Sequence, residues 1–124
     1  MVSPLDMKAL ATIAFLMDRR ENWSVITYGD LAKRLGHAQQ GLGGILDRVG
    51  AWCFSINKQS LAMLVISEQG EPNEGMYRHF KGDTDPVTKE SYERRRVQLW
   101  REDWSNVVLP TVEEIAASYD KLKL

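Results

Sequence analysis

Residues 27–36 read Thr-Tyr-Gly-Asp-Leu-Ala-Lys-Arg-Leu-Gly, and signals for both ends of a short helix are contained in them. Its first residue, Thr27, is of a type that caps helix N-termini. Its last, Gly36, is of the type that ends helices in a left-handed conformation. The pattern therefore predicts a short helix over residues 28–35, followed by a tight turn at the glycine.

A longer helix is predicted directly after this turn, over residues 38–56. Its apolar residues share one narrow arc at about 100° per residue: Leu42, Ile45, Leu46, Val49, Cys53 and Ile56. The opposite arc is small and polar, which suits a groove of nucleic acid. Gly41, Gly43 and Gly44 each cost about 1 kcal/mol in a helix relative to alanine. They therefore indicate the close approach of a sugar-phosphate backbone or of a neighbouring helix.

Elements on either side complete the expected core. A first helix begins at residues 3–6, where a hydroxyl cap precedes a proline and an acid. Its buried stripe is expected to contain Leu10, Ile13, Ala14 and Met17. Residues 61–67 form an apolar run of strand length, and residues 76–80 are expected to return beside them as a hairpin.

Two helices are expected after the hairpin, over residues 85–104 and, behind a capping box at Thr111 and Glu114, up to about residue 122. Val97, Trp100 and Trp104 are expected to cover the core. The order of elements is that of a winged helix-turn-helix. We therefore expect a mainly α fold with a small β-hairpin, in one domain over residues 1–124. Its winged-helix core spans about residues 5–80 and its C-terminal helical extension about residues 85–122.

Composition limits the classes of function. The 124 residues contain 16 Lys and Arg against 17 Asp and Glu, so the formal charge is −1 and contact with a polyanion has to come from a local patch. One cysteine excludes an internal disulfide, and no residue pattern indicates a metal or cofactor. The longest apolar run is far shorter than the roughly 20 residues that cross a bilayer. We expect a soluble, cytoplasmic protein without a membrane partner.

Positive charge concentrates around the predicted helix pair. Between residues 19 and 58, the six cations exceed the three anions, which gives a local balance of +3 in a chain of net charge −1; the cations are Arg19, Arg20, Lys33, Arg34, Arg48 and Lys58. Such segregation favours a surface that faces a polyanion, and an ordinary solvated face is the alternative.

The segment Ile26-Thr27-Tyr28-Gly29-Asp30-Leu31-Ala32-Lys33-Arg34-Leu35-Gly36 resembles the start of the DNA-binding domain of O6-alkylguanine-DNA alkyltransferases and alkyltransferase-like proteins. Gly43-Gly44-Ile45-Leu46, the apolar residues 64–66, Gly70 and Gly75 continue the resemblance, which covers about residues 26–77. It implies a winged helix that binds DNA, with Tyr28 pressing on the backbone of the nucleotide that the family extrudes.

The chain departs from the family at two places. Gln40 stands where the family has an arginine that fills the gap left by the extruded base, so the charge is missing. The family's Pro-Cys-His-Arg centre aligns with residues 61–64, which places Ala62 at the nucleophile and Met63 at its histidine. Without a thiolate and its base, the resemblance implies a DNA-binding protein that is not an enzyme.

The leading hypothesis is therefore contact with duplex DNA through the third helix. Lys33, Arg34 and Arg48 are expected to contact phosphates, Gln39 and Gln40 to reach base edges, and Tyr28 to press on the backbone. Burial of Gln40 and Arg48 beneath the C-terminal helices would contradict this arrangement.

The second hypothesis is a protein-interaction or inhibitor module. Glu68, Glu71 and Glu74 place three negative charges on the predicted hairpin, where they repel phosphates and suit a basic protein partner. Four tryptophans leave room for one or two at an interface. Cys53 lies on the apolar stripe, so we expect a buried structural thiol.

Overall fold

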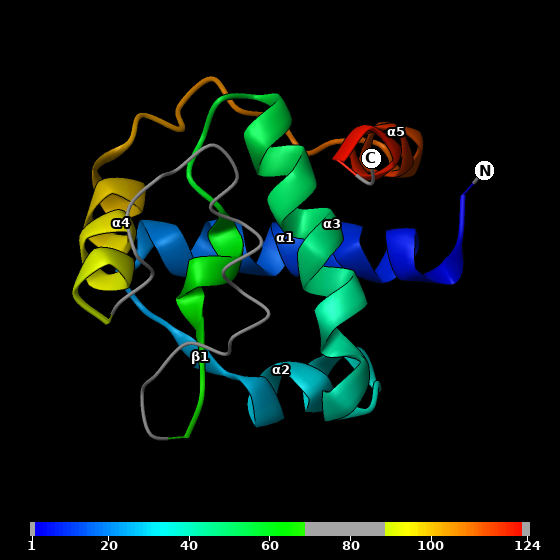
Figure 1. The fold of residues 1–124 in the computed structure, drawn as a ribbon, viewed down its shortest axis with the longest axis horizontal. Coiled ribbons are helices and arrows are strands. Elements are labelled where there is room, and N and C mark those ends of the chain that lie inside the picture. Colours follow the sequence, from blue (N-terminus) through cyan, green and yellow to red (C-terminus); the bar gives the residue numbers. More distant parts are fainter. Residues whose placement is uncertain (1, 69–88, 123–124) are drawn as a thin grey trace.

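The computed structural model describes residues 2–68 and 89–122, and this part of the chain is mainly helical (Figure 1). The elements, in chain order, are α1 (Pro4–Glu21), β1 (Ile26–Thr27), α2 (Tyr28–Leu35), the 3₁₀ helix η1 (Gln39–Gly41), α3 (Leu42–Ser55), the 3₁₀ helix η2 (Leu61–Leu64), β2 (Val65–Ile66), α4 (Lys89–Arg101) and α5 (Val112–Leu122). None of the helices in these residues is both long and apolar enough to span a bilayer.

Local capping sets the ends of three helices as predicted. The Thr27 hydroxyl accepts a hydrogen bond from the Asp30 backbone N–H at 3.2 Å, and Gly36 ends α2 with a φ of 59°, in the left-handed region. At α1, the Asp6 carboxylate accepts from the Ser3 backbone N–H at 2.7 Å. At α5, the Thr111 hydroxyl accepts from the Glu114 backbone N–H at 3.1 Å. The predicted limits of α2 are confirmed.

The third helix is shorter than the predicted span of residues 38–56. Residues 39–41 instead close a tighter 3₁₀ turn, in which the Gly41 N–H donates to the Ala38 carbonyl at 3.0 Å, and α3 begins only at Leu42. Its predicted apolar arc is confirmed, because Leu42, Ile45, Leu46, Val49 and Cys53 are all buried; Ile56, which follows the helix, is half-buried.

The strand predicted over residues 61–67 is mostly a 3₁₀ helix. The Ser60 hydroxyl accepts from the Ala62 N–H at 3.1 Å and so caps η2, which leaves only Val65–Ile66 extended. These residues pair in parallel with β1, with Ile26 opposite Val65. The predicted returning strand over residues 76–80 lies outside the described residues.

The buried face of α1 is rotated from the predicted stripe. Ile13 is fully buried as expected, whereas Ala14 is exposed and Leu10 and Met17 are only partly buried. Buried positions instead include Ala9, Thr12 and Leu16. The rotation arises because α1 packs against several elements at once: α3 crosses it, and α5 and η2 also contact it (Figure 1).

The C-terminal helices close the core. On α4, Leu99 is fully buried while Val97 is 38% exposed, so Leu99 takes the position predicted for Val97. Trp104, just after α4, is buried as expected. Arg96 fastens α4 to η2 by donating from Nε to the Met63 carbonyl at 3.1 Å. The start of the predicted fourth helix, at residues 85–88, lies outside the described residues.

Candidate nucleic-acid interface

Four of the predicted contact residues are exposed on adjacent elements: Lys33 and Arg34 in the last turn of α2, and Gln39 and Gln40 in η1. The left-handed turn at Gly36 joins the two elements. Together they form one end of the molecule, opposite the segment that connects α4 to α5 (Figure 1). This surface, defined by these four side chains, is called the α2–η1 surface below.

An acidic side chain borders this surface. A Cβ atom added to Gly29 would lie 3.7 Å from the Gln39 side-chain oxygen and 3.5 Å from a Glu68 carboxylate oxygen. Both side chains therefore meet at the first turn of α2, where the unpaired backbone N–H groups of a helix favour negative charge. Glu68 is exposed there, and Glu71 and Glu74 lie outside the described residues. A phosphate near Gln39 would therefore be repelled by Glu68.

Tyr28 and Arg48 do not belong to the α2–η1 surface. The Tyr28 side chain lies in the hydrophobic core, with 7% of the residue exposed. The Arg48 side chain is 12% exposed and pairs with Asp6, its Nε lying 2.8 Å from the carboxylate oxygen. Its guanidinium carbon lies 4.1 Å from the ring centroid of Tyr119, on α5. Arg48 is thus packed against a C-terminal helix, whereas Gln40 is exposed.

Helix α5 also covers the arc of α3 that was expected to enter a groove. Ala51, on that arc, is 3% exposed, and Ile115 and Ala116 of α5 are buried. A Cβ atom on Gly44 would lie 3.4 Å from a methyl carbon of Leu5, so the close neighbour of this glycine is the side chain of another helix, α1. Of this arc, Gln40 and Ser55 are exposed, and they lie at its two ends.

The Asp6–Arg48 pair is a buried structural ion pair. Burial alone raises the pKa of Asp6, but hydrogen bonds from the Ser3 backbone and the Arg48 guanidinium outweigh burial and hold the pKa below its ordinary value of 3.8. Arg48 also donates to the Gly44 carbonyl at 2.8 Å. The positive charge of Arg48 is therefore already compensated inside the protein.

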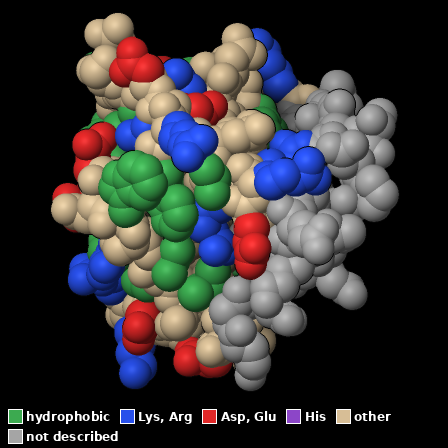
Figure 2. Space-filling view, turned by 90° about the vertical axis from the view of Figure 1, so that its left-hand side faces the viewer, with side chains coloured by type: hydrophobic (Ala, Val, Ile, Leu, Met, Phe, Trp, Pro, Cys, Tyr) green, Lys and Arg blue, Asp and Glu red, His purple; other side chains and the backbone are tan. Residues whose placement is uncertain are grey.

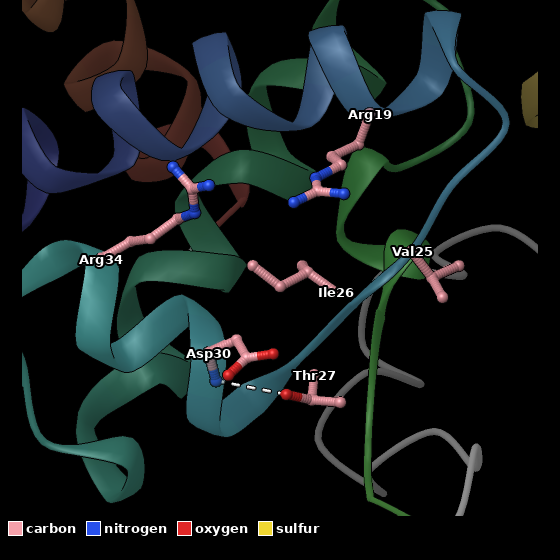
Figure 3. A pocket seen from close by; sticks show the side chains of 6 residues that line it. All are labelled: Arg19, Val25, Ile26, Thr27, Asp30 and Arg34. Carbon is pink, nitrogen blue, oxygen red and sulfur yellow. Dashed lines mark hydrogen bonds between the residues drawn. The ribbon is translucent and has the colours of Figure 1, made fainter.

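A second arginine, which sequence reasoning did not assign to the site, joins Arg34. The guanidinium carbons of Arg19 and Arg34 lie 4.8 and 4.3 Å from the ring centroid of Phe15. Both side chains line an open hollow of about 450 Å³ between α1, β1 and α2, together with Val25, Ile26, Thr27 and Asp30. Figure 3 shows the two guanidinium groups pointing toward each other across this hollow. The i, i+4 spacing of Phe15 and Arg19 was the sequence signal that could have indicated half of this arrangement.

The other cations of the predicted patch serve the structure. Arg20 is 7% exposed and donates from Nε to the Leu99 carbonyl at 2.8 Å. Lys58 donates to the Asp103 carbonyl at 2.6 Å. The six cations therefore do not form one surface, and Arg19, Lys33 and Arg34 are those that remain near the α2–η1 surface.

The positions that would carry alkyl transfer are enclosed. Ala62 and Met63 are 0% and 1% exposed. Cys53 is fully buried on α3, where desolvation raises the pKa of its thiol to about 12. This confirms the expectation of a buried thiol, and such a group stays protonated near neutral pH. No group of three or more metal-ligating side chains occurs among the described residues.

The turn before α3 leaves little room for a side chain at Gly41, which a pair of variants can test. A Cβ atom on Gly41 would lie 2.5 Å from Nε2 of His37, whose Nδ1 accepts a hydrogen bond from Lys8 Nζ at 2.7 Å. Gly41→Ala is expected to displace the imidazole and lower the free energy of unfolding by about 1–2 kcal/mol. Gly43→Ala meets no atom within 4 Å and is expected to be neutral or to stabilise by up to about 1 kcal/mol. Urea unfolding of both variants measures the difference, and equal effects would contradict the described turn.

A separate apolar surface lies at the far end of α1. Trp23 is 62% exposed, has a φ of 54°, which is strained for a bulky side chain, and stacks on Trp100 with ring centroids 5.6 Å apart. Figure 2 shows hydrophobic side chains gathered into a patch on the side of the molecule where α4 lies. A hollow of about 380 Å³ is lined there by aromatic and acidic side chains, which include Trp23, Trp100, Trp104, Glu21, Glu102 and Asp103.

Comparison of the chain with protein-family models, with curated proteins and with solved structures gives no match. The chemistry and geometry of the chain's own residues are therefore the basis for assigning a function.

Proposed function

We propose that this protein binds duplex DNA without modifying it, through the α2–η1 surface and the first turn of α3, as a winged helix-turn-helix of the alkyltransferase-like type. The observation that carries the proposal is the exposure of Lys33, Arg34, Gln39 and Gln40 on two adjacent elements. In helix-turn-helix proteins, the residues at the start of the second helix contact base edges while the first helix crosses the backbone. Lys33 and Arg34 in the last turn of α2, and Gln39 and Gln40 in η1 just ahead of α3, support such contacts.

Each pair of residues has a distinct task in this proposal. Lys33 and Arg34 contact phosphates, which gives affinity that depends strongly on salt but carries no sequence information. Gln39 and Gln40 reach base edges, where a glutamine amide can both donate to and accept from adenine. Arg48 and Tyr28 have no direct contact in this proposal, because both are covered by neighbouring side chains.

A non-enzymatic role agrees with the closed positions described above. Ala62 and Met63 offer neither a nucleophile nor a base, and both are buried. The Cys53 thiol, with a pKa of about 12, does not ionise near neutral pH. We therefore propose that the chain keeps the DNA contact of the family it resembles and lacks the alkyl-transfer step.

Fluorescence anisotropy with a labelled duplex tests this function. Lys33→Gln is expected to weaken duplex affinity several-fold at low salt, because it removes one phosphate contact. Lys121→Gln is the matched control, since Lys121 is an exposed lysine in the last turn of α5 and lies outside the proposed interface. Equal affinities of the two variants would contradict the proposed surface, as would a wild-type protein that does not bind.

The second candidate function is a protein-interaction module, and exposed Trp23 favours it. Tryptophan is enriched at protein interfaces, and Trp23 combines a 62% exposed ring, stacked on Trp100, with a backbone φ of 54° that bulky residues rarely adopt. The test is capture of a basic protein by the wild-type chain. Capture that is lost in Trp23→Ser, by a wild-type chain that binds no duplex, would favour this function over DNA binding.

A further inference from the structure

The hollow between α1, β1 and α2 is lined by two arginines that form no ion pair with the described residues. Both guanidinium carbons lie within 5 Å of the Phe15 centroid, so they are at most about 9 Å apart. Among residues 2–68 and 89–122, the ion pairs are Arg20–Glu21 and Arg48–Asp6. Neither Arg19 nor Arg34 belongs to an ion pair there, although Arg19 lies 3.5 Å from the Ser24 hydroxyl.

The Phe15 ring contacts both guanidinium groups. A guanidinium group over an aromatic face is attracted by the ring's negative charge density, and a stacked side chain loses fewer conformations when a ligand binds. Both guanidinium groups line one open hollow, and each can donate two parallel hydrogen bonds to the oxygens of a phosphate. The repulsion between the two like charges is relieved when an anion lies between them.

A hydroxyl group adds a neutral donor to the same hollow. The Thr27 oxygen accepts the Asp30 N–H, so the Thr27 hydroxyl proton can point outward to an acceptor. The hollow has about 450 Å³ of space and is open on one side, so a group attached to a larger molecule can enter it (Figure 3).

We infer that this hollow is a phosphate-binding site in which Arg19 and Arg34 hold one phosphate group between them. The inference rests on the proposed function in one respect: the expected source is a backbone phosphate of the bound duplex. Inorganic phosphate has the same chemistry and is the other source. Arg19 on α1 thereby extends the DNA contact beyond the α2–η1 surface.

One lining residue of the hollow, Asp30, carries a negative charge. The Asp30 carboxylate lines the same hollow and repels a phosphate. Removal of this charge in Asp30→Asn is therefore expected to tighten phosphate binding, whereas a purely structural role of the hollow predicts no gain. Asp120→Asn, at an exposed position of α5, is the control with the same change in net charge.

The first measurement is duplex affinity by fluorescence anisotropy. Arg19→Gln is expected to weaken binding about tenfold, which is the effect of losing one charge-assisted contact. Arg101→Gln removes the same charge from an exposed position at the end of α4 and is expected to leave the affinity within twofold of wild type. If the wild type binds the duplex and the two variants match, the phosphate site is refuted while the proposed function stands.

The second measurement is an NMR titration of the Arg19 and Arg34 Nε–Hε signals with inorganic phosphate, against sodium chloride at equal ionic strength. Saturating shifts with phosphate only, tightened about twofold or more in Asp30→Asn and unchanged in Asp120→Asn, are expected. Absence of phosphate-specific shifts would overturn the inference. Shifts with phosphate in a protein that binds no duplex would support the site with free phosphate as its source, and would refute DNA binding.

Discussion

Arg48→Met is expected to lower the free energy of unfolding by about 3–5 kcal/mol, because it leaves the carboxylate of Asp6 buried without its partner. Asp6 is 2% exposed, and Arg48 Nε lies 2.8 Å from its carboxylate. The loss is large beside the roughly 5–15 kcal/mol by which a domain of this size is stable. Urea unfolding followed by circular dichroism measures it.

The controls for this variant separate stability from binding. Replacement of both partners, in Asp6→Leu with Arg48→Met, is expected to recover much of the loss, since no unpaired charge remains; the Ser3 N–H loses its acceptor and keeps the recovery incomplete. Folded Arg48→Met protein is expected to bind duplex DNA with wild-type salt dependence. A small loss of stability together with weaker, less salt-dependent DNA binding would show that Arg48 contacts the DNA.

The same pair predicts how stability responds to acid. The pKa of Asp6 is lower in the folded protein than its ordinary value of 3.8, because hydrogen bonds from Ser3 and Arg48 outweigh the opposing effect of burial. A group of this kind stabilises the fold above its unfolded pKa, and the contribution disappears as the pH falls through the folded pKa. Wild-type protein is therefore expected to lose more stability below about pH 4 than Asp6→Asn does.

The second large loss of stability is expected on replacing Arg20, which connects α1 to the end of α4 by hydrogen bonds. Arg20 is 7% exposed and donates to the carbonyls of Leu99 and Glu102. Leu99 lies in the last turn of α4 and Glu102 directly after it, where helix carbonyls lack a partner within the helix. Arg20→Met is expected to cost about 2–4 kcal/mol, because these carbonyls lose a charged donor. Its neighbour gives the control: Arg19→Met is expected to cost less than about 1 kcal/mol. Urea unfolding compares them, and similar losses would contradict the assignment of Arg20.

Local signals predicted the parts of the fold that local chemistry controls. Thr27 and Gly36 each define one end of α2, and the hydrogen bonds at each end join residues only three or four positions apart. The parallel pairing of Val65 with Ile26 joins residues far apart in the chain, and no periodicity in either segment indicates it. The Ser60 cap that turns residues 61–64 into a 3₁₀ helix is local but competes with an apolar run typical of a strand.

Long-range packing also separated the predicted contact residues. Lys33, Arg34, Gln39 and Gln40 are exposed as the DNA hypothesis requires, although exposure does not test the contact itself. Arg48 has the same chemistry as Arg34, but its fate depends on Asp6, 42 residues away, and on Tyr119 of α5. The charge of each arginine can be read from the sequence, but the side chains that surround it depend on how the chain folds.

Duplex affinity measured as a function of salt concentration shows whether this surface binds the phosphates of DNA. If Arg19, Lys33 and Arg34 contact backbone phosphates, the logarithm of the association constant falls linearly with the logarithm of the salt concentration, with a slope between about −2 and −3. Combining Arg19→Gln, Lys33→Gln and Arg34→Gln should bring the slope close to zero. An unchanged slope in the triple variant, or no wild-type binding at the lowest salt concentration, would contradict DNA binding at this surface.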